Sequence, residues 1–428
     1  MKILHLNTYD GNGGAGRASY RLNKALIASG IDSKLSTYVK FGSNEEIQPL
    51  YPGIISKTLA IVNILAERYL PKLYEKNVKV PFSLQLFGKD IHKHPALKNV
   101  DIIHLHWINH GFLSPKSLGS LAKLNKPIVW TMHDCNTFTG GCHVRFGCEN
   151  YIHECGNCPF LKNAGVNDIS HRTLLRKKNS YNKLDLNFIS PSNWLAKSAI
   201  KSSLLKDFPI KVIPNTLETN LFKPSDKIEA KESLHLDKNK FIILSGFMPS
   251  KKDSHKGTSY LIDALDKWLI EYPEMKEKAI LVIFGNKNSQ DMPAFGIPTK
   301  FLGIINNDEH LAKAYVSADL FLTPSLDDNL PNTVMESMAC GTPVVAFRTG
   351  GIPDMVDHEI NGYLAEYKNT EDFMNGIQWI YKHKNPISLA KEARLKIVNT
   401  FSEEKIAKQH INLYQSLLNS TPSNKDSY

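Results

Sequence analysis

The 428-residue sequence lacks a hydrophobic run long enough to cross a membrane, and it lacks the pattern of a signal peptide. Its best apolar stretch, TLAIVNILA at 58–66, is nine residues long, whereas a spanning helix needs roughly 20. Met1 and Lys2 lead directly into ILHLNT, which has the pattern of a strand rather than of a cleavable apolar segment. We therefore expect a protein that is made and kept in the cytoplasm.

The sequence also lacks low-complexity segments, short repeats and the basic-aromatic signature of RNA-binding modules, so we expect no nucleic-acid partner. Its formal net charge of +10 favours anionic partners such as nucleotides or acidic lipid headgroups, although a solvated lysine-rich surface gives the same balance. With 42% hydrophobic residues the chain is expected to be folded and globular. Its length suits two domains of roughly 200 residues each.

Short apolar runs recur along the chain, each followed by a loop and a helix-like stretch. They lie at 3–8, 102–107, 128–133, 187–192 and 211–215, and then at 241–247, 279–285, 320–325 and 343–347. Such runs are typical of strands buried on both faces, and their alternation with helices predicts parallel sheets in an α/β fold. The polar stretch 215–240 interrupts the series and indicates a connection between two doubly wound domains. Ligands bind beyond the carboxyl ends of such strands, so we expect an active site between the domains.

The segment PSLDDNLPNTVMESMACGTPVVAF, residues 324–347, joins an acidic loop to a predicted helix. Pro331 suits the first helical turn, where its missing N–H costs nothing, and the remaining free N–H groups of that turn form an anion site. Asp328 lies in the loop. Glu336 lies about one turn inside the helix, where it can accept hydrogen bonds from a pair of sugar hydroxyls. A helix cap followed by an exposed glutamate would give the same local pattern.

The spacing Asp328-x7-Glu336 resembles the acidic motif of the retaining GT-B glycosyltransferases of family 4, the glycosyl transferases group 1. Members of that family usually carry Glu at the first position, and Asp328 is one methylene shorter. The resemblance implies two Rossmann-like domains facing across a cleft and a transferase that uses a nucleoside diphosphate sugar. It also implies that Glu336 binds the ribose of the nucleotide and Asp328 the transferred sugar.

Motifs in the first half of the chain agree with this resemblance. GNGGAGRASYRL at 11–22 follows the first strand and opens a helix, and its glycines let a phosphate approach the backbone. They also satisfy the dinucleotide spacing G-x-G-x-x-G, but no acidic residue follows the next strand at 33–39, which disfavours a Rossmann dehydrogenase. WTMHD at 130–134 ends a strand, and the matching histidine of the family, here His133, lies beside the reacting sugar.

In the second half, residues 245–265 resemble the phosphate-binding segment of the family, and Lys256 fits the lysine that neutralises the donor diphosphate. Phe247 stands where the family usually has an arginine. Lys251 or Lys252 could substitute as point charges without the bidentate geometry of arginine, or could belong to a solvated charge run. The resemblance thus implies catalytic roles for His133, Lys256, Asp328 and Glu336. It implies donor contacts at Gly13, Gly14, Arg17, Lys251, Lys252, Asn329, Leu330, Pro331, Asn332 and Thr333.

The mechanism implied by the resemblance keeps the anomeric configuration of the sugar, and the phosphate of the donor takes the proton of the acceptor. No divalent metal or other cofactor is required for catalysis. The implied partners are a UDP- or GDP-linked sugar and a saccharide or lipid-linked oligosaccharide acceptor.

Five of the six cysteines lie between residues 135 and 159. Cys142, Cys148, Cys155 and Cys158 are separated by five, six and two residues, and only the last pair has the spacing of a zinc finger. In a reducing cytosol a structural zinc is more plausible than disulfides, and a thiol-lined loop without metal is equally compatible. The patch resembles those of family 4 enzymes associated with colanic acid and other exopolysaccharides, which favours surface polysaccharide or capsule synthesis.

The stretch 54–94 is apolar and basic. Leu59, Val62, Ala66 and Leu70 line one side of a predicted helix, and such a helix can lie at the inner face of the cytoplasmic membrane. An amphipathic helix packed on the core of the protein is the more common structure.

We expect domains at 1–220, with the cysteine-rich insertion 135–159, and at 221–395, followed by a C-terminal helix, 396–428, that crosses back to the first domain. The alternatives to a glycosyltransferase are a GT-B sugar-nucleotide epimerase and a catalytically degenerate, zinc-stabilised binding protein. A phosphorylase would need a pyridoxal lysine environment, which the sequence does not reveal.

Overall fold

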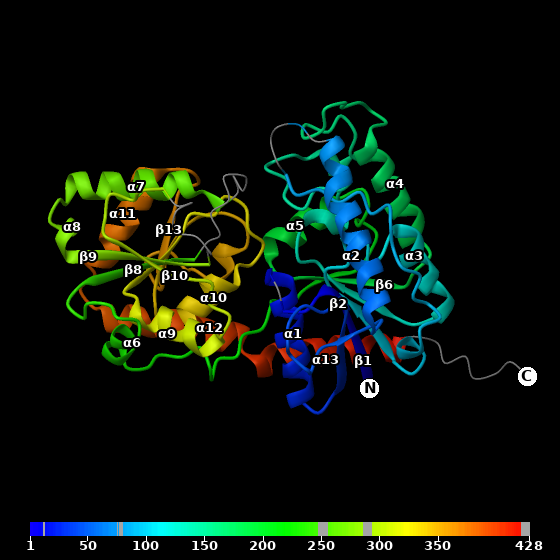
Figure 1. Ribbon diagram of the computed structural model, residues 1–428, viewed down its shortest axis with the longest axis horizontal. Helices are drawn as coiled ribbons and strands as arrows, with labels where there is room; N and C mark the ends of the chain where they lie inside the picture. Colours follow the sequence, from blue (N-terminus) through cyan, green and yellow to red (C-terminus); the bar gives the residue numbers. More distant parts are fainter. Residues whose placement is uncertain (12, 75, 77–79, 247–255, 286–292, 421–428) are drawn as a thin grey trace, which may run out of the picture. The chain divides into compact units, whose positions relative to one another are not determined.

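The computed structural model describes residues 1–11, 13–74, 76, 80–246, 256–285 and 293–420 (Figure 1). The chain divides into two compact units, which we call the first domain (Met1–Thr216 with Glu403–Tyr428) and the second domain (Leu217–Ser402). The second boundary follows α12 (Pro386–Phe401), whose buried side chains belong to the core of the second domain. The chain therefore returns to the first domain seven residues later than the sequence indicated, since 402 rather than 395 ends the second domain.

The polar stretch 215–240 is not a linker beyond its first residues. Leu217, Phe222, Ala230 and Leu234 are buried in the core of the second domain, and α6 (Lys227–Ser233) lies among them. The prediction of a linker was wrong because the exposed face of this short helix is densely charged, whereas the few apolar positions that anchor it are widely spaced.

The first domain is built on a seven-stranded sheet with the order β3-β2-β1-β4-β5-β6-β7, and all of its strand pairs are parallel. Its strands are β1 (Lys2–Tyr9), β2 (Asp32–Val39), β3 (Gln48–Pro49), β4 (Ile102–Leu105), β5 (Ile128–Thr131), β6 (Leu186–Ser190) and β7 (Ile210–Val212). Its α-helices are α1 (Gly13–Ala28), α2 (Ile54–Tyr69), α3 (Pro115–Gly119), α4 (Ile169–Tyr181), α5 (Asn193–Lys201) and α13 (Glu403–Ser420).

Successive residues of β1 point to opposite faces of this sheet, and each face has its own core. Leu4 and Leu6 belong to the larger core, whereas Ile3 packs with residues of α1 and of α13. Ala407 and Tyr414 of α13 are fully buried there, so the last helix completes the first domain.

The second domain is built on a six-stranded parallel sheet with the order β10-β9-β8-β11-β12-β13. Its strands are β8 (Phe241–Gly246), β9 (Ala279–Phe284), β10 (Thr299–Gly303), β11 (Leu320–Thr323), β12 (Val344–Phe347) and β13 (Gly362–Ala365). Besides α6 and α12, its α-helices are α7 (Thr258–Glu271), α8 (Met275–Lys278), α9 (Asp308–Ser317), α10 (Asn332–Ala339) and α11 (Thr370–Tyr381).

Two cores flank this second sheet as well. One lies under α6, α9, α10 and α12 and the other under α7 and α11, so the domain has three layers (Figure 1). The prediction of an α/β fold with two doubly wound parallel sheets is confirmed. The sequence pattern did not indicate β10 and β13, because these edge strands are short and β10 is only partly buried.

Candidate active site

Each sheet has one place where the direction of strand order reverses, between β1 and β4 in the first domain and between β8 and β11 in the second. Ligands of doubly wound sheets bind at the carboxyl ends of the strands beside such a switch point. In the first domain, Gly13 begins α1 after β1, and His133 follows β5, which neighbours β4. In the second domain, the loops after β8 and β11 carry Lys256 and Asp328. These predicted residues therefore lie at the carboxyl ends of strands at or next to the switch point of each domain.

The glycine loop after β1 has a backbone that requires glycine. Gly11 and Gly13 have φ angles of +58° and +80°, which L side chains rarely adopt. A Cβ at Gly16 would lie 3.1 Å from the backbone nitrogen of Gly11, so the helix start folds tightly over this turn. Gly13 and Gly14 are exposed in the first turn of α1, the end of a helix that favours negative charge.

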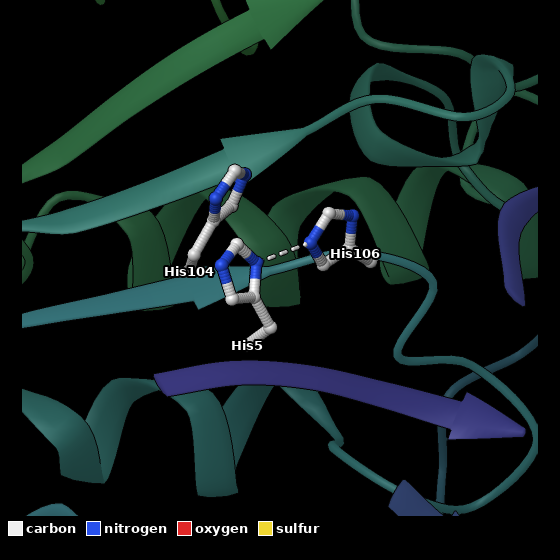
Figure 2. Close-up of side chains that lie close together, drawn as sticks. All are labelled: His5, His104 and His106. Carbon is white, nitrogen blue, oxygen red and sulfur yellow. Dashed lines mark hydrogen bonds between the residues drawn. The ribbon is translucent and has the colours of Figure 1, made fainter. Parts of the chain in front are cut away.

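A chain of histidines leads from the sheet to His133, and Figure 2 shows its buried part. His5 Nδ1 lies 2.9 Å from His106 Nε2, and His106 Nδ1 lies 3.0 Å from His133 Nε2. Burial lowers the pKa of His5 to about 3, with a smaller effect from the charge of His410, and it lowers the pKa of His133 to about 4. Burial also lowers the pKa of His106 well below its usual value, so all three rings are neutral near pH 7 and each carries a single N–H.

His5, the first residue of this hydrogen-bonded chain, indicates which ring nitrogens carry the protons. His5 Nε2 is buried and has no hydrogen-bond partner among the described residues. Buried N–H groups without partners are rarer than unpartnered acceptors, so we place the proton of His5 on Nδ1. His106 then accepts at Nε2 and donates from Nδ1, and His133 accepts at Nε2. His133 consequently carries its own proton on Nδ1, where it is a hydrogen-bond donor rather than a base.

His5, His104 and His106 also form a group of three potential metal ligands whose nitrogens lie within 4.8 Å of one another (Figure 2). However, His104 Nδ1 bonds the hydroxyl of Tyr414 at 2.7 Å, and its Nε2 bonds Thr131 Oγ1 at 2.8 Å. Of the six ring nitrogens only His5 Nε2 is unengaged, so the cluster is a hydrogen-bond network and not a preformed metal site.

Asp134, the neighbour of His133, holds a second network. Its Oδ2 lies 2.6 Å from His143 Nδ1 and accepts a hydrogen bond of 2.8 Å from Trp107 Nε1. Burial acts to raise the pKa of the Asp134 carboxyl, but the charge of His143 and these hydrogen bonds outweigh it and hold the pKa below its usual range. His143 Nε2 bonds Ser83, so both nitrogens of His143 are engaged. The carboxylate therefore fixes the loop beside His133.

In the second domain the predicted cation and the predicted anion meet directly. Lys256 Nζ lies 3.0 Å from Asp328 Oδ2, and both side chains are partly exposed. Gly257, which caps α7, has a φ angle of +67°, and a Cβ there would overlap the carbonyl oxygen of Pro324. The loop after β8 can approach the loop after β11 this closely only because residue 257 is glycine.

The loop after β12 supports the acidic loop from its other side. Gly351 N donates to the carbonyl oxygen of Asp328 at 3.0 Å, and Thr349 Oγ1 donates to that of Leu326 at 2.9 Å. A Cβ at Gly350 would overlap the Asp328 carbonyl. This support was not predicted, although the local sequence TGG at 349–351 is a signal of a turn.

Helix α10 differs from the prediction at its first residue. Pro331 is the N-cap, with an extended backbone, and not part of the first turn; its carbonyl oxygen accepts from Val334 N at 3.1 Å. Leu330 and Pro331 are buried, so only their backbone atoms could serve a ligand. Asn329, Asn332 and Thr333 are partly exposed.

Glu336 is 1% exposed, and its Oε2 accepts a hydrogen bond of 2.9 Å from the hydroxyl of Tyr315 on α9. The local pattern had suggested an exposed glutamate as its simplest alternative, and the structure excludes that alternative. Tyr315 was not indicated by the sequence, because the contact joins two helices 21 positions apart. Lys251, Lys252 and Phe247 lie outside the described residues.

The remaining predicted features lie in the first domain. Cys142, Cys148, Cys155 and Cys158 line a single small cavity and carry free thiols. Helix α2 packs through Ala60 and Ile64, whereas Leu59 and Val62 are exposed. None of the described helices is both long enough and apolar enough to pass through a membrane.

Comparison with known proteins agrees with this geometry. The model of Glycosyltransferase Family 4 matches residues 12–221, and that of Glycosyl transferases group 1 matches residues 239–383. The structure of the Anabaena protein HepE in complex with UDP and glucose superposes with a TM-score of 0.64 at 19% identity, covering 97% of this chain and all of HepE. The fold is therefore that of the GT-B glycosyltransferases.

Two relatives extend over nearly the whole chain. N-acetyl-alpha-D-glucosaminyl L-malate synthase of Bacillus anthracis is 22% identical and covers 99% of this chain and 100% of that protein. WcaC of Escherichia coli, a glycosyl transferase named for colanic acid biosynthesis, is 21% identical over 97% of this chain and 100% of its own length. The chain belongs to glycosyltransferase family 4 and is a transferase enzyme.

Proposed function

We propose that the enzyme transfers a sugar, with retention of anomeric configuration, from a nucleoside diphosphate sugar to a saccharide or lipid-linked saccharide acceptor. The ion pair of Lys256 and Asp328 at the switch point of the second domain carries this proposal. In the absence of a donor, each group neutralises the other. When a donor binds, Lys256 can turn to the diphosphate. Asp328 can then accept hydrogen bonds from hydroxyl groups of the transferred sugar.

Negative charge develops on the diphosphate as the glycosidic bond breaks, and Lys256 and the N–H end of α10 in the second domain stabilise it. In the first domain, the start of α1 is a second place that favours negative charge. His133, held neutral and protonated on Nδ1, donates a hydrogen bond instead of removing a proton. The donor phosphate takes the proton of the acceptor, and neither a protein base nor a divalent metal is required.

The donor is proposed to be UDP- or GDP-linked. HepE was crystallised with UDP and glucose, which supports a UDP-sugar. The name of WcaC supports a place in surface polysaccharide synthesis. These supports come from relatives at low identity, so both specificities belong to this proposal.

A lipid-linked acceptor is supported by the exposed face of α2. Ile54, Ile55, Leu59, Val62 and Tyr69 on this helix are all more than half exposed. Lys57 and Arg68 lie on the same helix, and basic residues favour anionic headgroups. We propose that this helix rests on the inner face of the cytoplasmic membrane, where such an acceptor would be presented.

The experiment that tests the proposal measures the thermal midpoint of the protein against a panel of UDP-, GDP- and TDP-sugars. A selective increase that is lost in the Glu336→Ala variant supports a nucleotide site next to α10 and identifies the donor. Release of the free nucleotide is then measured with and without candidate acceptors. Turnover without an acceptor favours an epimerase, and no increase with any nucleotide favours a degenerate binding protein.

A further inference from the structure

We propose that Cys142, Cys148, Cys155 and Cys158 bind one zinc ion that holds the cysteine-rich loop of the first domain in place. All four line one cavity of about 20 Å³, together with Phe82 and Phe160. A volume of this size holds about one water-sized particle. Four cysteines that are separated by five, six and two residues thus line a space that suits a single ion, and tetrahedral coordination by four cysteines is typical of structural zinc.

The backbone of this loop needs a constraint of this kind. Regular structure between β5 and α4 is limited to two short 3-10 helices, η4 (Cys135–Phe138) and η5 (Asn150–Ile152). Phe146, Glu154, Cys155 and Asn157 have positive φ angles although none of them is glycine. Such conformations persist only where the surroundings enforce them. Three of these four residues directly precede or form part of the segment Cys155-x2-Cys158.

A buried cation supplies an independent indication. Lys177 of α4 is fully buried, and its ammonium group donates to the carbonyl oxygens of Asn136 and Thr139. Its ammonium group makes no direct ion pair with a carboxylate in the described part of the chain, but Cys142, Asp134 and Cys155 all lie close enough to interact with its charge. A buried cation is costly unless nearby negative charge offsets it. A zinc ion with four thiolates carries a net charge of −2, which would balance Lys177 together with Arg145 on the cavity wall.

Other potential ligands near the loop are already engaged. His143 bonds Asp134 through one nitrogen and Ser83 through the other. Cys135 is buried in the main core of the first domain rather than at the cavity. The backbone nitrogen of Gly140 donates to Cys155 Sγ at 3.2 Å, a contact that stabilises a thiolate. His153, which also lies in the loop, does not line the cavity, and no other histidine or carboxylate among the described residues does. The four cysteines are therefore the proposed ligand set.

The sulfurs are spread more widely than in a loaded site. The group of three histidines is the one set of three or more potential ligands found within 4.8 Å of one another among the described residues, and no three of these sulfurs meet that criterion. Tetrahedral zinc with Zn–S bonds of about 2.3 Å requires sulfurs about 3.8 Å apart. Zinc binding must therefore contract the loop, and removal of zinc must loosen it.

This contraction would act on the site without taking part in transfer. Cys142 is next to His143, which bonds the carboxylate of Asp134 beside His133. The ion would thus position that carboxylate through two residues, and its loss should loosen the loop without removing any group that contacts the donor.

The test uses the full chain without a histidine tag, purified under reduction, and measures its metal content by mass spectrometry. We expect about one zinc per chain in the wild type and less than a tenth of that in C155S and C158S. The matched control is C340S, because Cys340 is also a buried free thiol but belongs to the second domain, and it should retain the zinc. Zinc in C158S at the wild-type level, or a metal-free wild type, would overturn the proposal.

Because a cysteine variant could fail to fold, a second measurement uses the wild type alone. Titration with a mercurial reagent should release one zinc for about four thiols modified, and the cobalt-substituted protein should show the visible and sulfur-to-metal bands of a tetrahedral tetrathiolate. Disulfides found after alkylation in the fresh lysate, or the absorption of an iron–sulfur cluster, would contradict a zinc site. Neither measurement depends on transferase activity, so failure of the proposed function would leave this result intact.

Discussion

The two domains share one topology but present opposite chemistry at their switch points. In the first domain, His5, His106 and His133 form a neutral hydrogen-bonded chain. In the second domain, Lys256 and Asp328 form an ion pair with 37% and 20% of their side chains exposed. The difference follows from burial, because a buried imidazole is harder to protonate. Lys256 and Asp328 are partly exposed and paired with each other, so both remain charged. The shared fold thus sets where each site lies, and the residues in the loops determine which chemical groups the site contains.

Lowering the pH should destabilise the first domain much more than the second. His5, His104, His106 and His410 are buried, and burial lowers the pKa of each of them below 6.5. The unfolded chain therefore binds more protons than the folded chain below pH 6.5, and the folded state loses stability as the pH falls. The loss is about 2 kcal/mol per histidine between pH 7 and pH 5.

Calorimetry at pH 7 and at pH 5 measures this effect. The transition of the first domain should move to lower temperature much more than that of the second, which has none of these four residues. Equal shifts of both transitions would show that these histidines are protonated in the folded protein.

The next effect concerns the charge pair of the second domain. Lys256→Ala should lower kcat/KM for sugar transfer by about 100- to 1,000-fold, or about 3–4 kcal/mol, because the leaving diphosphate loses its counter-charge. Lys227→Ala is the matched control, since Lys227 Nζ lies 2.8 Å from Asp319. Asp319 precedes β11 at the amino end of the strand, whereas Asp328 follows the carboxyl end. A similar loss in both variants would assign the defect to folding rather than to the donor site.

Gly257→Ala should destabilise the second domain by about 1–3 kcal/mol, because a Cβ meets the Pro324 carbonyl and the φ angle is positive. Gly30→Ala separates the two causes. Gly30 has a φ angle of +81° but nothing within 4 Å of a Cβ, so this variant of the first domain carries backbone strain alone. Denaturant unfolding of both variants gives the comparison, and equal losses would remove the argument that the two loops must approach closely.

The smallest effect tests the proton assignment in the first domain. His106→Phe should lower kcat about tenfold, or about 1.4 kcal/mol, with little change in KM, because His133 loses the donor that fixes its tautomer. Nitrogen NMR of labelled histidine should show His133 protonated on Nδ1 in the wild type and mixed in the variant. If His133 of the wild type were protonated on Nε2, the donors and acceptors along the hydrogen-bonded chain of histidines would be reversed.

Much of the fold follows from local pattern. Continuous apolar runs such as those at 102–107 and 241–247 indicated buried parallel strands, because both faces of such strands are covered. The same pattern did not reveal β10 at the sheet edge. It also led us to predict a linker at 215–240, because the anchoring side chains there are sparse. Strands and helices with a strong period could be predicted, whereas short edge elements could not.

The order of the central strands and their helices, the acidic spacing of Asp328 and Glu336, and the residue types that end each central strand could be predicted from the amino-acid sequence. Which of these residues meet depends on the folded chain: Lys256 contacts Asp328, His106 contacts His133, and Glu336 contacts Tyr315. The physical reason is that each pair joins residues at least 21 positions apart. Their contact depends on strand order in the sheets and on close approaches that glycine permits at Gly257 and Gly350, and no local pattern encodes either.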